Sequence, residues 1–232
     1  MSERPERLSR RGLLIGGASG VAIVGASLGR GFAAPGRDAR RLTNRLELWS
    51  SFARQSTNLL ARYTSTRSSP LLREELVGSG ALAFVAPNTL VLRDDSATGS
   101  TTRIQAGGIS ITPNDPSLPR RPLPPRAEAP ALRWLADHLI ACFAPGDGSA
   151  LTQGARVEVP RSRTPRIQLL PPRDSAARAL LRSVTLTLEQ VGGAVVRVEI
   201  AQSDGGTFVL ALADHRQKVE RELLDRVLDD PS

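Results

Sequence analysis

The strongest constraint on the fold is a period of two in the large apolar residues in the last third of the chain. Aliphatic or aromatic side chains take every second position in residues 184–188, 196–200 and 208–212, and glycine pairs at 192–193 and 205–206 separate these runs. Successive side chains of a β-strand point to opposite faces, so a period of two predicts strands with one buried and one polar face. Turns this short predict an antiparallel meander.

The same alternation appears earlier in the chain, in short segments at residues 81–85, 89–93, 108–112 and 167–169. A glycine pair at 107–108 supplies a turn before the third of these. Half-buried antiparallel strands give this pattern, because one face of the sheet covers the core while the other meets water. The predicted fold class is therefore mainly β (α+β).

Other segments have apolar residues at every third or fourth position, which indicates amphipathic helices. The first begins at Arg40 and ends near Asn58, and a second covers residues 131–143. A short helix is predicted from Asp174 to Arg182, with Asp174 as its N-cap. A C-terminal helix is predicted for residues 214–228, with one apolar side formed by Val219, Leu223 and Val227.

Seven prolines lie in residues 113–130 among charged side chains. Proline has no amide hydrogen for a strand ladder and fixes its own φ angle. The segment is therefore predicted to be a loop or polyproline II, connecting or gating the two halves of the domain.

The N-terminus has the features of an export signal. Arg10 and Arg11 precede two leucines, as in the twin-arginine pattern, and an uncharged run follows from Gly12 to Leu28. This run is too short and too glycine-rich for a permanent membrane span. Small residues at 31–34 suit signal peptidase. We therefore expect residues 1–34 to be a twin-arginine signal peptide and residues 35–232 to form one domain, soluble in the periplasm after cleavage.

Charge and cysteine content narrow the function classes. The formal net charge is +8, but the arginines of the expected domain are interspersed with acids, and only eight aromatic residues are present for base stacking. Nucleic-acid binding is therefore not favoured. The single cysteine, Cys142, allows neither an intrachain disulfide nor a zinc cluster, and its position in an apolar stretch predicts a small buried side chain.

No catalytic constellation stands out. His138 and His215 fall in predicted helices, and no Cys, Asp or Glu at metal-ligand spacing stands out near either of them. Asp204 precedes two glycines and is interpreted as a turn residue rather than an acid catalyst. The expected domain has neither a Gly-x-Ser-x-Gly elbow nor a phosphate-binding loop. We predict that the chain is not an enzyme and needs no cofactor or metal, with an uncharacterised hydrolase as a remaining alternative.

Two stretches resemble the LolA-like family of periplasmic outer-membrane lipoprotein carriers. Residues 79–88, Ser-Gly-Ala-Leu-Ala-Phe-Val-Ala-Pro-Asn, are similar to its "S-G-x-L-x-F-x-x-P-x" pattern. Residues 167–174, 183–186, 196–200 and 203–205 are similar to its second half, "L-x-L-x-P-x-D … I-x-L … V-x-x-V-x-I … x-D-G". The likeness covers most of residues 48–212.

This resemblance implies an unclosed antiparallel β-barrel, formed by one strongly curved sheet with helices covering its concave face. It also implies a cavity for acyl chains, and a role as a monomeric carrier that takes acylated lipoproteins or another lipid from an inner-membrane export complex to an outer-membrane receptor. An aliphatic lining suits this cargo, because each buried methylene contributes about 0.8 kcal/mol. A lipid-binding sensor or regulator of a membrane protein is the alternative.

The candidate cavity lining consists of the apolar positions of the predicted strands together with one tryptophan of the second predicted helix. These residues are Leu82, Phe84, Leu90, Leu92, Ile109, Ile111, Trp134, Ile167, Leu169, Leu186, Leu188, Val196, Val198 and Ile200.

Overall fold

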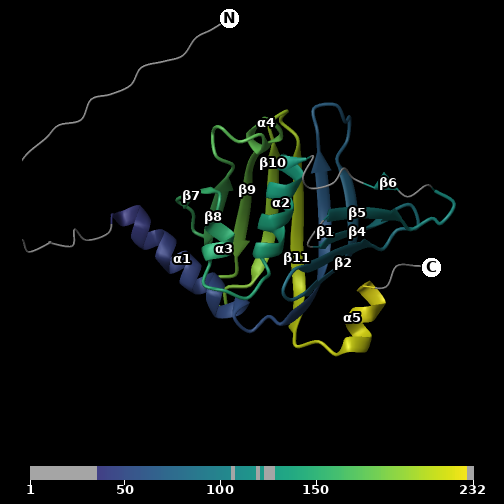
Figure 1. Cartoon of the computed structure of the whole chain (residues 1–232), viewed down its shortest axis with the longest axis horizontal. Coiled ribbons are helices and arrows are strands. Elements are labelled where there is room, and N and C mark those ends of the chain that lie inside the picture. Colours follow the sequence, from purple (N-terminus) through teal and green to yellow (C-terminus); the bar gives the residue numbers. More distant parts are fainter. Residues whose placement is uncertain (1–35, 106–107, 119–120, 123–128, 229–232) are drawn as a thin grey trace, which may run out of the picture. The chain divides into compact units, whose positions relative to one another are not determined.

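The computed structural model describes residues 36–105, 108–118, 121–122 and 129–228 (Figure 1). Strands dominate, and helices lie at the start, in the middle and at the end of this part of the chain. In chain order the elements are α1 (Arg37–Ala53), β1 (Asn58–Ser68), β2 (Leu76–Val85), β3 (Thr89–Asp94), β4 (Ser100–Gln105), β5 (Gly108–Pro113), β6 (Arg121–Pro122), α2 (Pro130–Ala141), α3 (Ser149–Thr152), β7 (Arg156–Glu158), β8 (Arg166–Leu170), α4 (Ala177–Leu180), β9 (Leu181–Leu188), β10 (Val195–Gln202), β11 (Thr207–Gln217) and α5 (Arg221–Leu228).

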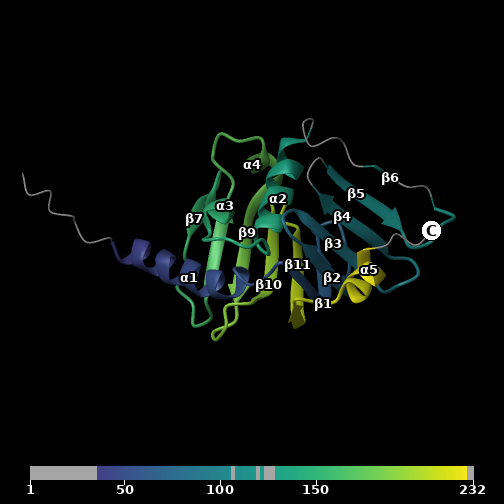
Figure 2. The same cartoon turned by 60° about the horizontal axis from the view of Figure 1, so that its bottom comes forward.

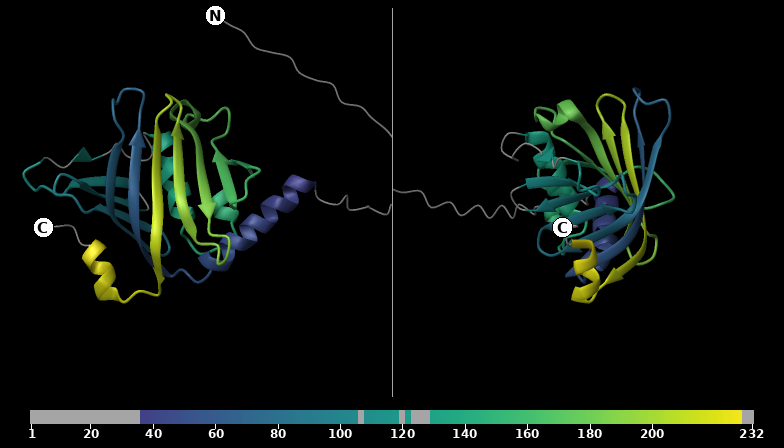
Figure 3. Two further views of the ribbon diagram at one scale, coloured as in Figure 1. Left: turned by 180° about the vertical axis from the view of Figure 1, so that it is seen from behind. Right: turned by 90° about the vertical axis from the view of Figure 1, so that its right-hand side faces the viewer.

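The strands of the described residues form one antiparallel sheet of eleven strands, in the order β6-β5-β4-β3-β2-β1-β11-β10-β9-β8-β7. The first and last strands of the chain meet in the middle of this order, where β1 pairs with β11. The two ends of the sheet, β6 and β7, do not pair with each other. Seen from the side, the sheet bends so that α2 lies within its curve (Figure 3). The predicted fold class, a mainly β, unclosed antiparallel barrel with helices, is confirmed.

Most aliphatic positions of the predicted strands share one face of the sheet. Register partners run across it, from Ile104 to Leu90, from Leu90 to Phe84 and from Phe84 to Leu59. The other half of the sheet has the same arrangement, with direct partners joining Ile167 through Leu186 and Val198 to Leu210. This row is the floor of the main hydrophobic core.

Helices α1 and α2 cover the main hydrophobic core on the side opposite the sheet. Trp49 of α1 is 2% exposed and its Nε1 donates to the backbone oxygen of Cys142, at 3.0 Å. Leu139 and Ile140 of α2, and Phe143 just beyond it, are buried in the same cluster. Helix α1 thus packs against the end of α2, and both cover the inner face of the sheet.

Helix α5 lies on the opposite face, beside β2 and β3 (Figure 2). Leu224 and Val227 pack there on Ala83 and Val91, which point away from the main core. Two arginines hold the end of the helix: Arg93 donates to the backbone oxygen of Arg226 at 2.6 Å, and Arg103 of β4 donates to that of Leu228. The sheet is therefore covered on both faces in this region.

We expect Val227→Ala to lower the free energy of unfolding by about 1–2 kcal/mol, because it removes two buried methylene equivalents from a small cluster. Amide hydrogens of α5 should exchange faster, while those of β10 stay protected. Urea denaturation and hydrogen exchange measure these effects, and Glu222→Ala, an exposed change on the same helix, serves as the control. Equal loosening of α5 and β10 would contradict a separate cluster.

The C-terminal helix begins later than predicted. Residues 214–217 continue β11, because its ladder with β1 reaches Gln217, the partner of Leu59. The chain turns only at Lys218, whose φ is 54°, and the helix starts at Arg221. The prediction of a helix from Asp214, and with it the placement of His215 in a helix, was wrong because strand pairing overrode the local periodicity.

Two further predictions need correction. The short helix covers only Ala177–Leu180, its N-cap is Ala176, and Asp174 does not cap it. Leu181 already pairs with Gln202 as part of β9, so the helix ends before Leu181.

Within the proline-rich segment, the described pair Arg121–Pro122 forms an edge strand on β5, a position that tolerates proline. Residues 119–120 and 123–128 lie outside the described residues.

Candidate functional site

The predicted lining residues are mostly packed core. The following are buried in the main cluster beneath the helices: Leu82, Phe84, Leu90, Ile167, Leu169, Leu186, Leu188, Val198 and Ile200. Leu92, Ile109 and Trp134 are partly buried against the same cluster. The inner face of the sheet is therefore filled by side chains of α1, α2 and the strands.

Val196 and Ile111 have other positions. The register of β10 shifts between Val195 and Arg197, so that Val195 is the residue buried in the main core. Val196 is only partly buried, because the irregularity moves it out of the alternation seen in the sequence. Ile111 pairs with Thr102 near the β5 edge and is half-buried.

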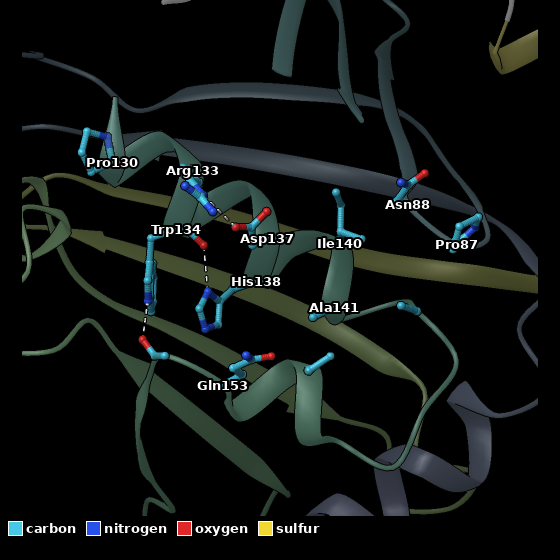
Figure 4. A pocket seen from close by; sticks show the side chains of 13 residues that line it. Pro87, Asn88, Pro130, Arg133, Trp134, Asp137, His138, Ile140, Ala141 and Gln153 are labelled. Atoms are coloured by element: carbon cyan, nitrogen blue, oxygen red, sulfur yellow. Dashed lines mark hydrogen bonds and ion pairs between the residues drawn. The ribbon is translucent and has the colours of Figure 1, made fainter. Parts of the chain in front are cut away.

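An open cleft of about 670 Å³ lies beside α2. It is bounded by α2, by α3 and the residues after it, and by the turn between β2 and β3 (Figure 4). Most of its wall is apolar or aromatic. The lining residues are Pro87, Asn88, Pro130, Arg133, Trp134, Asp137, His138, Ile140, Ala141, Ala144, Ala150, Gln153 and Gly154.

Trp134 forms the aromatic wall of this cleft. Its Nε1 donates to the backbone oxygen of Gly154 at 2.8 Å. This hydrogen bond connects α2 to the segment that follows α3. Its ring stacks on that of His138, one helical turn away, with 4.0 Å between ring centroids and 29° between planes. Two restraints thus hold the indole in place, and it is the one predicted lining residue that borders the cleft.

His138 is 3% exposed. Its Nδ1 lies 2.7 Å from the backbone oxygen of Trp134, and a carbonyl only accepts, so Nδ1 carries the hydrogen. Nε2 has no well-formed hydrogen bond to any residue that the structure describes. Burial lowers the pKa of His138, while the Trp134 carbonyl, Asp137 and the Gln153 backbone act in the opposite direction. The imidazole is therefore kept neutral in the folded chain.

We expect the free energy of unfolding to fall as the pH is lowered below 6.5, the ordinary pKa of histidine. The folded pKa of His138 lies lower, so in this window the unfolded chain binds the proton first, and the stability present above pH 6.5 is progressively lost. His138→Phe keeps an aromatic ring against Trp134 and removes the titration. Urea denaturation over a pH series should show a flatter dependence for this variant, and an unchanged slope would assign the effect to other groups.

The two charged side chains of the cleft belong to α2. Arg133 Nε lies 3.8 Å from Asp137 Oδ2, and both side chains are more than half exposed, at 67% and 51%. An ion pair this exposed contributes little to stability. The pair places one positive and one negative charge at the cleft, and their electrostatic potentials partly cancel there.

The remaining sequence candidates have structural roles. Burial raises the pKa of the Cys142 thiol, which is 1% exposed, as expected for a small buried side chain. His215 Nε2 lies 2.9 Å from the backbone oxygen of Val195. Asp204 Oδ1 accepts from the Gly206 amide at 2.8 Å, which confirms its role in a turn. Among the described residues, no group of three or more His, Cys, Asp and Glu side chains could hold a metal ion.

Comparison with known proteins gives no match to a family model and none to a curated sequence. Solved structures do match. A LolA superfamily protein from Nitrosomonas europaea is 9% identical, with a TM-score of 0.43 over 78% of this chain and 95% of the other. A DUF1329 family protein from Desulfovibrio piger is 8% identical, with a TM-score of 0.43 over 79% and 99%. LprF from Mycobacterium bovis is 12% identical, with a TM-score of 0.34 over 80% and 97%.

The chain is similar to LolA-like proteins. Each of these TM-scores lies below 0.5, so the function has to come from the residues of this chain. The LolA-like stretch at residues 79–88 falls on β2 and the turn after it, and two of its residues, Pro87 and Asn88, border the cleft.

The sequence contained one signal for the cleft that the LolA-like interpretation did not use. Arg133, Trp134, Asp137, His138 and Ala141 recur at intervals of three or four, so they share one side of the predicted helix and mix polar with apolar types. Gln153, Gly154 and Pro87 lie in connections, and no periodicity marks such positions.

Proposed function

We propose that this chain is a periplasmic protein that binds the acyl chains of a lipoprotein or another envelope lipid, and that it moves this cargo toward the outer membrane. Export depends on the twin-arginine signal of residues 1–34, including Arg10 and Arg11, which lie outside the described residues. Residues 35–232 form the binding domain. No helix of the described part combines the length and the hydropathy needed to cross a bilayer.

The observation that carries the proposal is the cleft beside α2. Its volume of about 670 Å³ lies within the range of about 300–1,000 Å³ that small-molecule sites occupy. Apolar and aromatic groups make up most of its wall, with a few polar groups between them. Such a wall suits an acyl chain, since every methylene removed from water contributes about 0.8 kcal/mol.

The filled core supports a position of the acyl chain in the cleft. Phe84, Leu186 and Val198 are fully buried beneath the helices, so the inner face of the sheet offers no space in this conformation. In this proposal the acyl chain runs along the side of α2 that borders the cleft, past Trp134 and Ala141, towards the turn at Pro87.

The test is native mass spectrometry on the full chain, expressed with its leader, purified from the periplasmic fraction without detergent and followed by lipid extraction. A co-purifying acylated species is the expected result and names the cargo. A clean apo mass, combined with failure to take up a fluorescent monoacylglycerol, would reject lipid binding.

A second step separates carriage from the regulatory alternative. The loaded protein is incubated with outer-membrane vesicles, and the lipid that remains bound is measured. Loss of cargo to the vesicles supports a carrier, which exchanges its load between membranes. Cargo that stays bound would instead favour a lipid-binding regulator of a membrane protein.

A further inference from the structure

Exposed large apolar side chains gather at one end of the sheet. Among the described residues seven such side chains are exposed, and five of them belong to the loop between β1 and β2, the first residues of β2 and the end of α4. These five are Leu71, Leu72, Leu76, Val77 and Leu180. Soluble proteins rarely expose a contiguous apolar patch, and such a patch marks a surface for a partner or a membrane.

The elements that carry these side chains lie side by side, at the upper end of the sheet in Figure 1. The β1–β2 loop adjoins the turn between β10 and β11, because a Cβ on Gly205 would lie 3.4 Å from Pro70 Cγ. The Ser203 amide of the same turn donates to the backbone oxygen of Leu180 at 3.0 Å. The loop, the turn and α4 therefore form one continuous surface.

The start of β2 extends past the packed part of the sheet. Leu76 and Val77 follow each other, so their side chains point to opposite faces, yet both are exposed. Further along the strand, Leu82 and Ala83 also point to opposite faces, and each is buried in one of the two hydrophobic clusters. The core clusters thus bury both faces of β2 in its second half and leave both bare at its start.

A lipid bilayer fits this end of the sheet. Leu71 at the loop is 92% exposed, and the bare faces of Leu76 and Val77 lie on either side of the hairpin. A protein partner would need a pocket that surrounds the hairpin end from both sides. Hydrocarbon surrounds an inserted loop without a matching shape, and the binding strength scales with the apolar area buried.

Arginines next to the apolar side chains suit the same surface. Arg67 is the register partner of Leu76, and Arg73 follows the two leucines of the loop. Both arginines are exposed. A guanidinium binds phosphate oxygens, while its stem covers apolar surface. Glu74 and Glu75 lie beside them, so the apolar side chains, and not net charge, supply most of the attraction.

This end of the sheet also adjoins the first turns of α2, which border the cleft. Leu132 and Leu135 line a small groove of about 230 Å³ together with Leu180. Pro130 and Trp134, from the same turns, line the cleft. A bilayer that contacts the β1–β2 loop and α4 therefore lies close to one edge of the cleft.

We infer that the β1–β2 loop, with the turn and α4 beside it, docks on a lipid bilayer by inserting Leu71 and Leu72 among the lipids. The inference goes beyond the proposed function, because docking requires no cargo in the cleft. For a chain with that function, docking at this end gives an acyl chain a short path between the bilayer and the cleft.

The test is flotation of the full chain with vesicles of phosphatidylethanolamine and phosphatidylglycerol, after purification from the periplasmic fraction without detergent. The double variant Leu71→Ser, Leu72→Ser should bind the vesicles about a hundredfold more weakly, about tenfold for each leucine withdrawn from hydrocarbon. Both leucines are exposed, so urea denaturation should show unchanged stability. A double variant that floats like the unmodified chain, or an unmodified chain that does not float, would overturn the inference.

Val191→Ser is the matched control. Val191 is 82% exposed and lies in the turn after β9, at the other end of that strand from α4. Its replacement also removes an exposed aliphatic side chain, but it should leave vesicle binding unchanged. A loss as large as that of the double variant would assign the binding to general hydrophobicity and contradict docking by one end.

Insertion is measured with tryptophan at the same two positions. The emission of Leu71→Trp should shift to the blue on vesicle binding and be quenched by lipids brominated on their acyl chains. Val191→Trp should show neither effect, and Trp49 and Trp134 contribute the same background to both variants. Equal quenching of the two variants would contradict insertion of the loop.

Uptake of a fluorescent monoacylglycerol from water separates this inference from the proposed function. The double variant should take up the probe as the unmodified chain does, because neither leucine lines the cleft. A chain that floats with vesicles but takes up no probe retains the docking surface and loses the proposed function. A chain that takes up the probe but does not float loses the docking surface alone.

Discussion

Phe84→Ala should lower the free energy of unfolding by about 3–5 kcal/mol, the usual cost of removing a fully buried aromatic ring. Phe84 is 0% exposed, and its register partners Leu59 and Leu90 are 0% and 1% exposed. These neighbours belong to paired strands and cannot move into the vacated space without disturbing the ladder. The cavity therefore remains, and its cost adds to the lost transfer free energy.

Urea denaturation of the full chain measures this loss, and Phe208→Ala provides the comparison. Phe208 belongs to the same cluster but is only partly buried, so its removal should cost clearly less. Equal losses for the two variants would mean that the floor of the sheet is loosely packed. That result would reopen the inner face as a place for cargo.

The strand alternation predicted the sheet because both halves obey the same physical rule. Leu82 and Phe84 share a face, as do Leu186 and Leu188, and in each case the chain order of the residues was enough to assign it. Residues close in sequence decide this property. The pairing of β1 with β11, which joins the two ends of the domain, depends on distant residues and came only from the structure.

The errors lie where local and distant interactions compete. Val227 is buried on α5 as the predicted pattern requires, but Val219 precedes the helix, and Leu224 rather than Leu223 is buried beside Val227. The residues just before α5 are also polar enough for a helix. They continue β11 instead, because its ladder with β1 reaches Gln217, the partner of Leu59. Likewise the register shift between Val195 and Arg197 places Val195 in the core instead of Val196. Because valine occupies both positions, the sequence pattern does not show which of the two is buried.

The cleft was the least predictable feature, for a similar reason. Aliphatic residues that line an empty cavity and those that fill a core have the same pattern along a strand. The difference depends on how deeply α2 sits, with Leu139 and Ile140 against the sheet. That depth results from contacts with α4 and β3, which are distant in sequence, and with α3, the next helix along the chain.

Ala150→Trp should reduce the affinity for a fluorescent monoacylglycerol about a hundredfold, which corresponds to about 2.7 kcal/mol. Ala150 lines the cleft from α3 and is exposed, whereas its neighbour Leu151 is 0% exposed and anchors α3 in the core. An indole at this position projects into the space proposed for the acyl chain. Displacing three or four methylenes at about 0.8 kcal/mol each accounts for the expected loss.

Ala39→Trp is the control, because Ala39 is also exposed on a helix but lies on α1 and does not border the cleft. Its affinity for the probe should match that of the unmodified chain, and both variants should unfold at similar urea concentrations, since neither changes a buried side chain. If Ala150→Trp bound the probe normally, the acyl chain would have to lie elsewhere. The filled face beneath α2 would then be the alternative, and a lipid could reach it only if α2 moved away from Leu186 and Phe84.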